Sequence, residues 1–213
     1  MLCAICNKRP AKRFCPAKGE KICAICCGTE REVTIDCPSD CSYLISARRY
    51  ENEHRKPLTA EQVPYRDVQV PSEFVRERRD VVSGLGMTIL KFAAENKALD
   101  DSGAREALGA LAETYRTLAT GILYEKVPDG PVARALYAQL NQFLQDFKKQ
   151  ESERTGFSSL KDPQIFHLLI FLLRVVALET HPRARSRAFL DFLRAQFPRA
   201  AKPEKEASRI VMP

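Results

Sequence analysis

The last 172 residues of this 213-residue chain contain no cysteine, because all eight cysteines lie between Cys3 and Cys41. The chain also has no low-complexity tract, and 45% of its residues are hydrophobic, which excludes general disorder and predicts a packed core. Gly84 and Gly86 lack the third glycine and the preceding strand of a nucleotide-binding loop. No nucleophile–base signature occurs either, so we expect a protein that is not an enzyme.

No apolar run is long enough to cross a membrane. The longest, from Ile165 to Leu178, has 14 residues and is interrupted by His167 and Arg174, whereas a membrane-spanning helix needs about 20. The N-terminus opens into cysteines instead of a charged and apolar signal segment, so we expect a cytoplasmic protein with no membrane partner. In a reducing compartment, clustered thiols are typical of metal ligands and less so of disulfides.

Positive charge is present, but it is not concentrated as in a dedicated nucleic-acid binder. The formal net charge of +7 divides into +3 for residues 1–71, −1 for residues 72–180 and +5 for residues 181–213. Within the cysteine-rich region, basic side chains lie between the cysteines: Lys8, Arg9, Lys12, Arg13, Lys18 and Lys21. They either neutralise thiolates or form a patch for nucleic acid or an acidic partner, and Arg183, Arg185 and Arg187 have the same two interpretations.

The cysteine spacing is the strongest chemical signal. It comprises two Cys-x-x-Cys pairs, one Cys-x-x-x-Cys pair and two further thiols: Cys3/Cys6, Cys23/Cys26, Cys37/Cys41, Cys15 and Cys27. A structural zinc site needs four soft ligands in a tetrahedron, so eight cysteines supply two Zn²⁺ sites with no open position for catalysis. An iron–sulfur cluster is a weaker alternative, because the chain lacks a Cys-x-x-Cys-x-x-Cys run.

The eight ligands divide in two ways. Sequential sites would join neighbouring cysteines. Interleaved sites would pair the two Cys-x-x-Cys turns, giving a first site of Cys3, Cys6, Cys23 and Cys26 and a second site of Cys15, Cys27, Cys37 and Cys41. We prefer the interleaved arrangement, while the sequence leaves open whether Cys26 or Cys27 serves the first metal. Asn7 and Gly28 follow the two turns and tolerate the left-handed backbone that a tight turn requires.

This interleaved pattern resembles the cross-brace zinc fingers of the HIT and MYND type over residues 3–41. Cys3/Cys6, Cys15-Pro16, Cys23/Cys26 and Cys37/Cys41 carry the resemblance. Lys18 stands where those families have a further cysteine, and Cys27 is the spare thiol that could replace it. Both final ligands here are cysteines, whereas those families often end in histidine. The resemblance implies a module that binds another protein.

The rest of the chain predicts an all-α bundle of about five helices. Cys37 and Cys41 are one helical turn apart, which predicts a helix of about 15 residues that Ser39 or Asp40 could cap. Apolar periodicity and proline breaks predict the bundle helices at 73–98, 103–125, 131–152, from Asp162 to about 178, and 183–197. Gly84 and Gly86 predict a bend or a close helix crossing in the first of these.

Three prolines, Pro57, Pro64 and Pro71, mark a connector between the two parts, and a short strand at Val68 and Val70 is the alternative. We therefore predict a zinc-stabilised cysteine module at 1–56, a proline-rich linker at 57–72, a helical bundle at 73–198 and a charged tail at 199–213. We expect His54 to be solvated, His167 to be a hydrogen-bonded core residue and His181 to mark a helix end.

Together these features predict a zinc-binding adaptor or scaffold whose partner is another protein. The alternative is a regulatory nucleic-acid-binding protein that uses basic residues of the cysteine module and the C-terminal region. A third interpretation, an enzyme or small-molecule sensor, would need a polar pocket in the bundle near His167 or Arg174.

Overall fold

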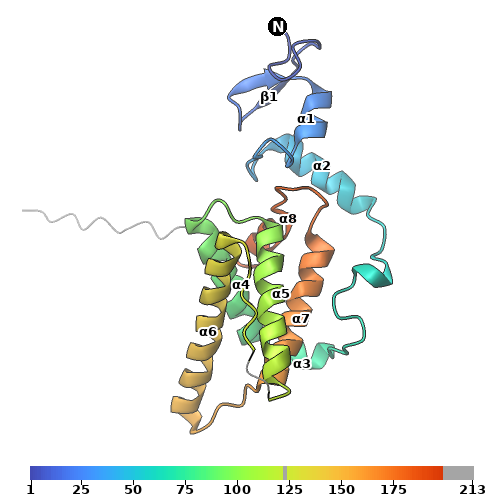
Figure 1. Ribbon diagram of the computed structural model, residues 1–213. Coiled ribbons are helices and arrows are strands. Elements are labelled where there is room, and N and C mark those ends of the chain that lie inside the picture. The colour runs from blue at the N-terminus through green and yellow to red at the C-terminus, as the bar shows by residue number, and fades with distance from the viewer. Residues whose placement is uncertain (122–123, 199–213) are drawn as a thin grey trace, which may run out of the picture.

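Helices make up most of the chain, and a small sheet lies near the N-terminus (Figure 1). The computed structural model describes residues 1–121 and 124–198, so the predicted tail at 199–213 lies outside the described residues. In chain order the elements are β1 (Arg13–Cys15), β2 (Glu20–Ile22), α1 (Ala24–Glu30), α2 (Ser42–Glu53), the 3-10 turn η1 (Ala60–Gln62), α3 (Ser72–Glu77), α4 (Arg79–Glu95), α5 (Asp101–Leu118), α6 (Pro131–Thr155), α7 (Asp162–Glu179) and α8 (Ala188–Gln196).

The bundle is built around α5 and α7, the pair of helices that pack most extensively. α6 covers α5 and α4, and α8 packs on α4 and α7. The apolar run of α7 supplies much of the core through Ile165, Leu168, Leu169, Ile170, Leu172, Leu173 and Val176. No helix among residues 1–121 and 124–198 is long and apolar enough to span a membrane.

Two predicted bundle helices differ from the observed ones. The helix predicted at 73–98 is interrupted at Arg78, whose backbone angles leave the helical region and whose side chain donates to Ser159 Oγ at 2.9 Å. The helix predicted at 183–197 begins only at Ala188, because residues 180–187 form an irregular segment that contacts the cysteine module. The helix predicted at 103–125 ends at Leu118, and residues 122–123 lie outside the described part.

The close helix crossing predicted from the glycines of α4 is confirmed. A Cβ atom on Gly84 would lie 2.1 Å from Cζ of Phe143 in α6, so α4 and α6 approach until the aromatic ring touches the backbone. Gly86 faces the ring of Phe197 in the same way, at 2.9 Å.

The connector at residues 57–72 is docked on the bundle. It contains η1 and a turn, and the alternative strand at Val68 and Val70 is not formed. Arg174 of α7 holds it by donating hydrogen bonds to the carbonyl oxygens of Pro64 (3.1 Å), Tyr65 (2.7 Å) and Val68 (2.7 Å). The one arginine in the apolar stretch of α7 therefore has a structural role that explains its position.

Candidate metal centre

A β-hairpin and two tight turns bring the first group of cysteines together. β1 and β2 pair antiparallel, with Phe14 opposite Lys21, and Cys23 follows directly after β2. The turn after Cys3 closes through Asn7, which has the predicted left-handed backbone (φ 50°). An N–H···O bond from Ala4 to Lys21 (3.2 Å) ties this turn to β2. Gly28 lies inside α1 without a positive φ, so the corresponding expectation for the second turn was wrong.

The sulfur atoms of Cys3, Cys6, Cys23 and Cys26 all lie within 4.8 Å of one another. Four thiolates bonded to one zinc ion at about 2.3 Å are separated by roughly 3.8 Å in a tetrahedron. Three of the cysteines are buried and Cys6 is half-buried, so the group is largely shielded from solvent. The group could therefore hold a metal ion, and it is Cys26, not its neighbour Cys27, that belongs to it.

Backbone donors already favour negative charge at this group. The N–H of Cys23 donates to Cys3 Sγ at 3.1 Å, and the N–H of Cys26 donates to Cys23 Sγ at 3.4 Å, where Cys23 caps α1. Burial opposes ionisation of Cys3, but N–H groups of Cys6 and Cys23 outweigh it and lower the pKa of Cys3 to about 6. Burial and the neighbouring sulfur atoms raise the pKa of Cys26 to about 12.

The pKa of Cys23 is lowered as well, chiefly by the N–H of Cys26, so it is Cys26 that resists losing its proton beside the other sulfur atoms. Hydrogen bonds favour the thiolates of Cys3 and Cys23, and burial next to these sulfur atoms opposes a further negative charge on Cys26. A bound metal ion removes that repulsion, which is why thiolate coordination releases protons. Arg9 provides part of the compensation, because contact with Cys23 and the charges of nearby sulfurs raise its pKa. For Arg9, the predicted role as a thiolate counter-charge fits the structure.

The second predicted group, Cys15, Cys27, Cys37 and Cys41, surrounds one small cavity walled by Ile22, Ile35 and Leu44. Its sulfur atoms are not gathered as tightly, since the first group is the one cluster of metal-ligating side chains found across residues 1–121 and 124–198. Burial, with the charges of Cys41 and Cys15 among the further causes, raises the pKa of Cys37. A second metal among these four cysteines stays a prediction.

The local structure around Cys37 and Cys41 differs from the expected helix. α2 begins at Ser42, Cys41 is its N-cap residue, and Cys37 lies in the loop before it. Neither Ser39 nor Asp40 caps the helix by a side-chain hydrogen bond. The four-residue spacing therefore places a loop cysteine beside a helix-capping cysteine, which still brings both to the same cavity.

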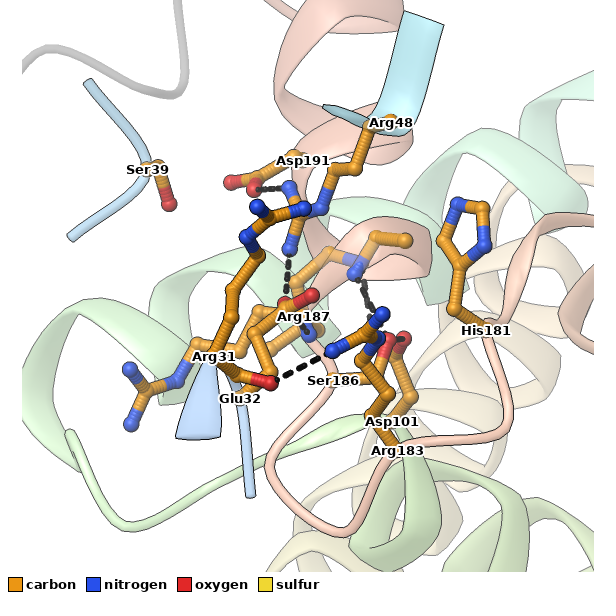
Figure 2. A network of polar contacts seen from close by, with 12 residues as sticks. Arg31, Glu32, Ser39, Arg48, Asp101, His181, Arg183, Ser186, Arg187 and Asp191 are labelled. Carbon is orange, nitrogen blue, oxygen red and sulfur yellow. Dashed lines mark hydrogen bonds and ion pairs between the residues drawn. The ribbon is translucent and has the colours of Figure 1, made fainter. Parts of the chain in front are cut away.

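A polar network joins the base of the cysteine module to the bundle, and no sequence pattern indicates which of its residues pair (Figure 2). Arg48 of α2 forms ion pairs with Glu32, which is 3% exposed, and with Asp191 of α8. Arg183 donates to the carbonyl oxygens of Gly28 (3.2 Å) and Arg31 (2.9 Å). This network fixes the module to residues 180–194.

Arg187 belongs to the same network. It donates to Asp36 at 2.5 Å and to the Lys97 carbonyl oxygen at 2.6 Å. Two of the three C-terminal arginines that could have formed a nucleic-acid patch, Arg183 and Arg187, are therefore engaged inside the protein. Only the backbone N–H of Arg185 takes part in the junction, donating to the Glu32 carbonyl oxygen at 2.8 Å, and its side chain is exposed.

The histidines divide between packing and the junction. His54 is exposed, as expected, and stacks on Tyr50. His167 is half-buried between the rings of Phe74 and Phe166. His181 follows the end of α7, as expected, but it is buried at the junction and lies 3.2 Å from Glu51. Burial lowers the pKa of His181, while the nearby Glu51 carboxylate opposes the shift.

Asp101 is a buried carboxyl group that ties α5 to α8. It accepts hydrogen bonds from Ser186 Oγ (2.7 Å) and from the N–H groups of Phe189 (3.2 Å) and Leu190 (3.3 Å) at the start of α8. Its neighbour Asp100 caps α5, whereas Asp101 caps the distant α8.

This buried carboxyl group predicts a specific pH dependence. Burial, which its hydrogen bonds only partly offset, raises the pKa of Asp101 to about 6, against about 3.9 in an unfolded chain. Between these values the folded state binds more protons, so the free energy of unfolding falls as pH rises to about 6 and then levels off. We expect Asp101→Asn to remove this component, worth about 3 kcal/mol at most.

Urea unfolding of both proteins from about pH 4 to pH 7 measures the difference. Loss of metal at low pH affects both proteins alike and cancels in the comparison. A difference between wild type and Asp101→Asn that stays constant over this range would contradict the assignment.

No protein-family model, no curated protein and no solved structure matches this chain.

Proposed function

We propose that the protein is a zinc-binding, non-enzymatic adaptor whose cysteine module binds another protein. It holds two Zn²⁺ ions, one in each interleaved group of four cysteines, in the manner of the HIT and MYND cross-brace fingers. The proposal includes a cytoplasmic location, because thiolate ligands must stay reduced. The observation that carries it is the buried Cys3/Cys6/Cys23/Cys26 cluster, in which four sulfur ligands leave no position for water or substrate.

The two side chains that could have indicated catalysis in the bundle have structural roles. The guanidinium group of Arg174 is used by three connector carbonyls. His167 packs edge-on against Phe74. These contacts favour the adaptor over the enzyme or sensor that a polar pocket near them would have supported.

The tip of the cysteine module, residues 1–27, is the surface we assign to the partner. Across the described part of the chain, the ion pairs and hydrogen bonds between module and bundle come from residues 28–55, and Figure 1 shows the tip standing clear of the bundle. The tip nevertheless exposes large apolar side chains: Leu2 is 58% exposed, Phe14 56% and Ile25 54%. Exposed apolar groups with basic neighbours are typical of an interface for a partner with apolar and acidic side chains.

Affinity capture with purified full-length baits tests this assignment. A Phe14→Ser/Ile25→Ser variant should lose the partner that the wild type retains in stoichiometric amount. A Phe157→Ser variant should keep it. Phe157 is 65% exposed and closely follows α6, whose C-terminal end lies at the end of the bundle away from the tip (Figure 1). Equal recovery by all three baits, or no stoichiometric partner for the wild type, would contradict the proposal.

Nucleic-acid binding is the second candidate, favoured by one observation. Lys8, Lys12, Lys18 and Lys21 are exposed on the same tip as Phe14, and cationic grooves with an aromatic side chain bind single strands. RNA or DNA affinity that falls steeply with salt would support this candidate. Absence of binding at low salt would remove it.

A further inference from the structure

A groove of about 600 Å³ lies where the three parts of the chain meet. Its walls come from the end of the cysteine module, the connector, α5, and the segment that follows α7. It is separate from the cysteines and from the exposed tip. Its volume falls in the range of small-molecule sites, about 300–1,000 Å³.

The charge of this groove is uncompensated. Arg55, Lys56 and Arg105 line it, and no aspartate or glutamate is among its lining residues. Within residues 1–121 and 124–198, none of these three cations forms an ion pair with a carboxylate. In the adjoining polar network, by contrast, every arginine of the following set has a carboxylate partner: Arg48, Arg183, Arg187 and Arg194.

The guanidinium group of Arg55 has N–H donors that are available to a ligand. Its Nη2 atom makes only long contacts, 3.4 Å to the Glu179 carbonyl oxygen and 3.5 Å to His181 Nε2. The other ring nitrogen of His181, Nδ1, faces Glu51 at 3.2 Å. Burial lowers the pKa of His181, so the neutral ring donates from Nδ1 to Glu51 and accepts from Arg55. Glu51 therefore lies at the side of the His181 ring opposite Arg55 and is not a lining residue, so the groove keeps its positive charge.

The remainder of the wall is apolar. Leu58 of the connector, Ala177 of α7 and Pro182 contribute hydrocarbon surface beside the cations. An inorganic anion would leave this surface unused, whereas an organic molecule with a charged end would cover it.

We propose that this groove binds a small organic phosphate, with Arg55, Lys56 and Arg105 holding the phosphate groups and the apolar wall contacting the organic part. Guanidinium groups match phosphate oxygens in bidentate geometry, and the lysine adds a point charge. Since the ligand would touch the end of α2, α5 and the segment after α7, it would also hold the cysteine module against the bundle. The proposal does not depend on the adaptor function.

Calorimetric titration of the zinc-loaded full chain with ADP, at low ionic strength and without free metal, tests the site. The double variant Lys56→Gln/Arg105→Gln should bind ADP about tenfold more weakly, or worse, because two charge-assisted contacts are lost. The matched control is Lys91→Gln/Arg154→Gln, which neutralises two exposed cations elsewhere and should bind like the wild type. Thermal melting verifies that both variants are folded.

Pyrophosphate and a short single-stranded oligonucleotide are titrated in the same way, to compare their binding with that of ADP. Weaker binding of pyrophosphate than of ADP is expected, because pyrophosphate cannot use the apolar wall. Three results would overturn the proposal: no ADP binding by the wild type, equal weakening by both double variants, or an oligonucleotide that binds more tightly than ADP through Lys56 and Arg105.

Discussion

Replacing Cys23 with serine is expected to unfold the cysteine module and to leave the bundle folded. Cys23 contributes a sulfur atom to the first group, donates its N–H to Cys3 Sγ and caps α1. Besides cysteines, the buried cluster of the module contains Ile22 and Ile35, and Leu44 of α2 is buried at the same cavity. Because so small a core cannot offset the chain entropy, we expect metal binding to supply the folding free energy; apparent values for structural zinc are about 10–16 kcal/mol.

The bundle should survive this change because its core is a separate cluster that draws on α4 to α8 and contains no cysteine. Elemental analysis should show loss of zinc in Cys23→Ser. Amide NMR signals of residues 1–41 should collapse to unfolded positions, while far-UV circular dichroism keeps the helical signal. Ala24→Ser is the matched control, since Ala24 is the exposed neighbour of Cys23 and should leave both readouts unchanged.

Cys27→Ser separates the two groups of cysteines. If the second group also binds zinc, native mass spectrometry should show one metal ion lost and one retained.

The Cys23→Ser variant provides the contradicting outcome for the first group. If its cysteine module stays folded without metal, the metal does not supply the folding free energy of the module.

Replacing Arg48 with methionine is expected to cost about 3–5 kcal/mol of stability, because it leaves the buried Glu32 carboxylate without its ion-pair partner. Glu32 is 3% exposed and Asp191 21% exposed, and Arg48 lies between them (Figure 2). Burial alone would lower the pKa of Arg48, but the pairs with Asp191 and Glu32 raise it. The arginine therefore stays charged. Its loss leaves Glu32 without an ion pair, whereas Asp191 keeps its pair with Arg194.

Urea unfolding compares Arg48→Met with Arg49→Met, which changes the exposed adjacent residue and should alter stability by no more than about 0.5 kcal/mol. Adding Glu32→Gln to Arg48→Met should recover part of the loss, since it removes one stranded charge. Equal stability of the two single variants would show that the Arg48 network does not hold the module on the bundle.

The first cysteine group could be predicted from the sequence because its information is local. Two Cys-x-x-Cys turns need only their own spacing and a left-handed residue such as Asn7 to present paired sulfurs. Apolar periodicity and proline breaks likewise predicted that α5 and α7 are helices, since these signals are visible without knowledge of the partner helix.

The junction could not be predicted, because its partners are distant in sequence and follow no repeat. Arg48 and Asp191 are 143 residues apart, and Arg183 and Gly28 are 155 apart. Glu32 adopts a left-handed backbone (φ 53°) that the residue type does not favour. The late start of α8 also depends on contacts that are distant in sequence. Residues 180–187 are irregular, and Arg183 and Arg185 among them hydrogen-bond to the cysteine module.

X-ray absorption at the zinc edge tests the central claim most directly, because it reports the ligands of the bound metal. The account predicts that each zinc ion has four sulfur neighbours at about 2.3 Å and no lighter ligand. A nitrogen or oxygen ligand at about 2.0–2.1 Å would indicate an open or mixed site and contradict the closed structural centre. Purified protein that contains no zinc would contradict it outright.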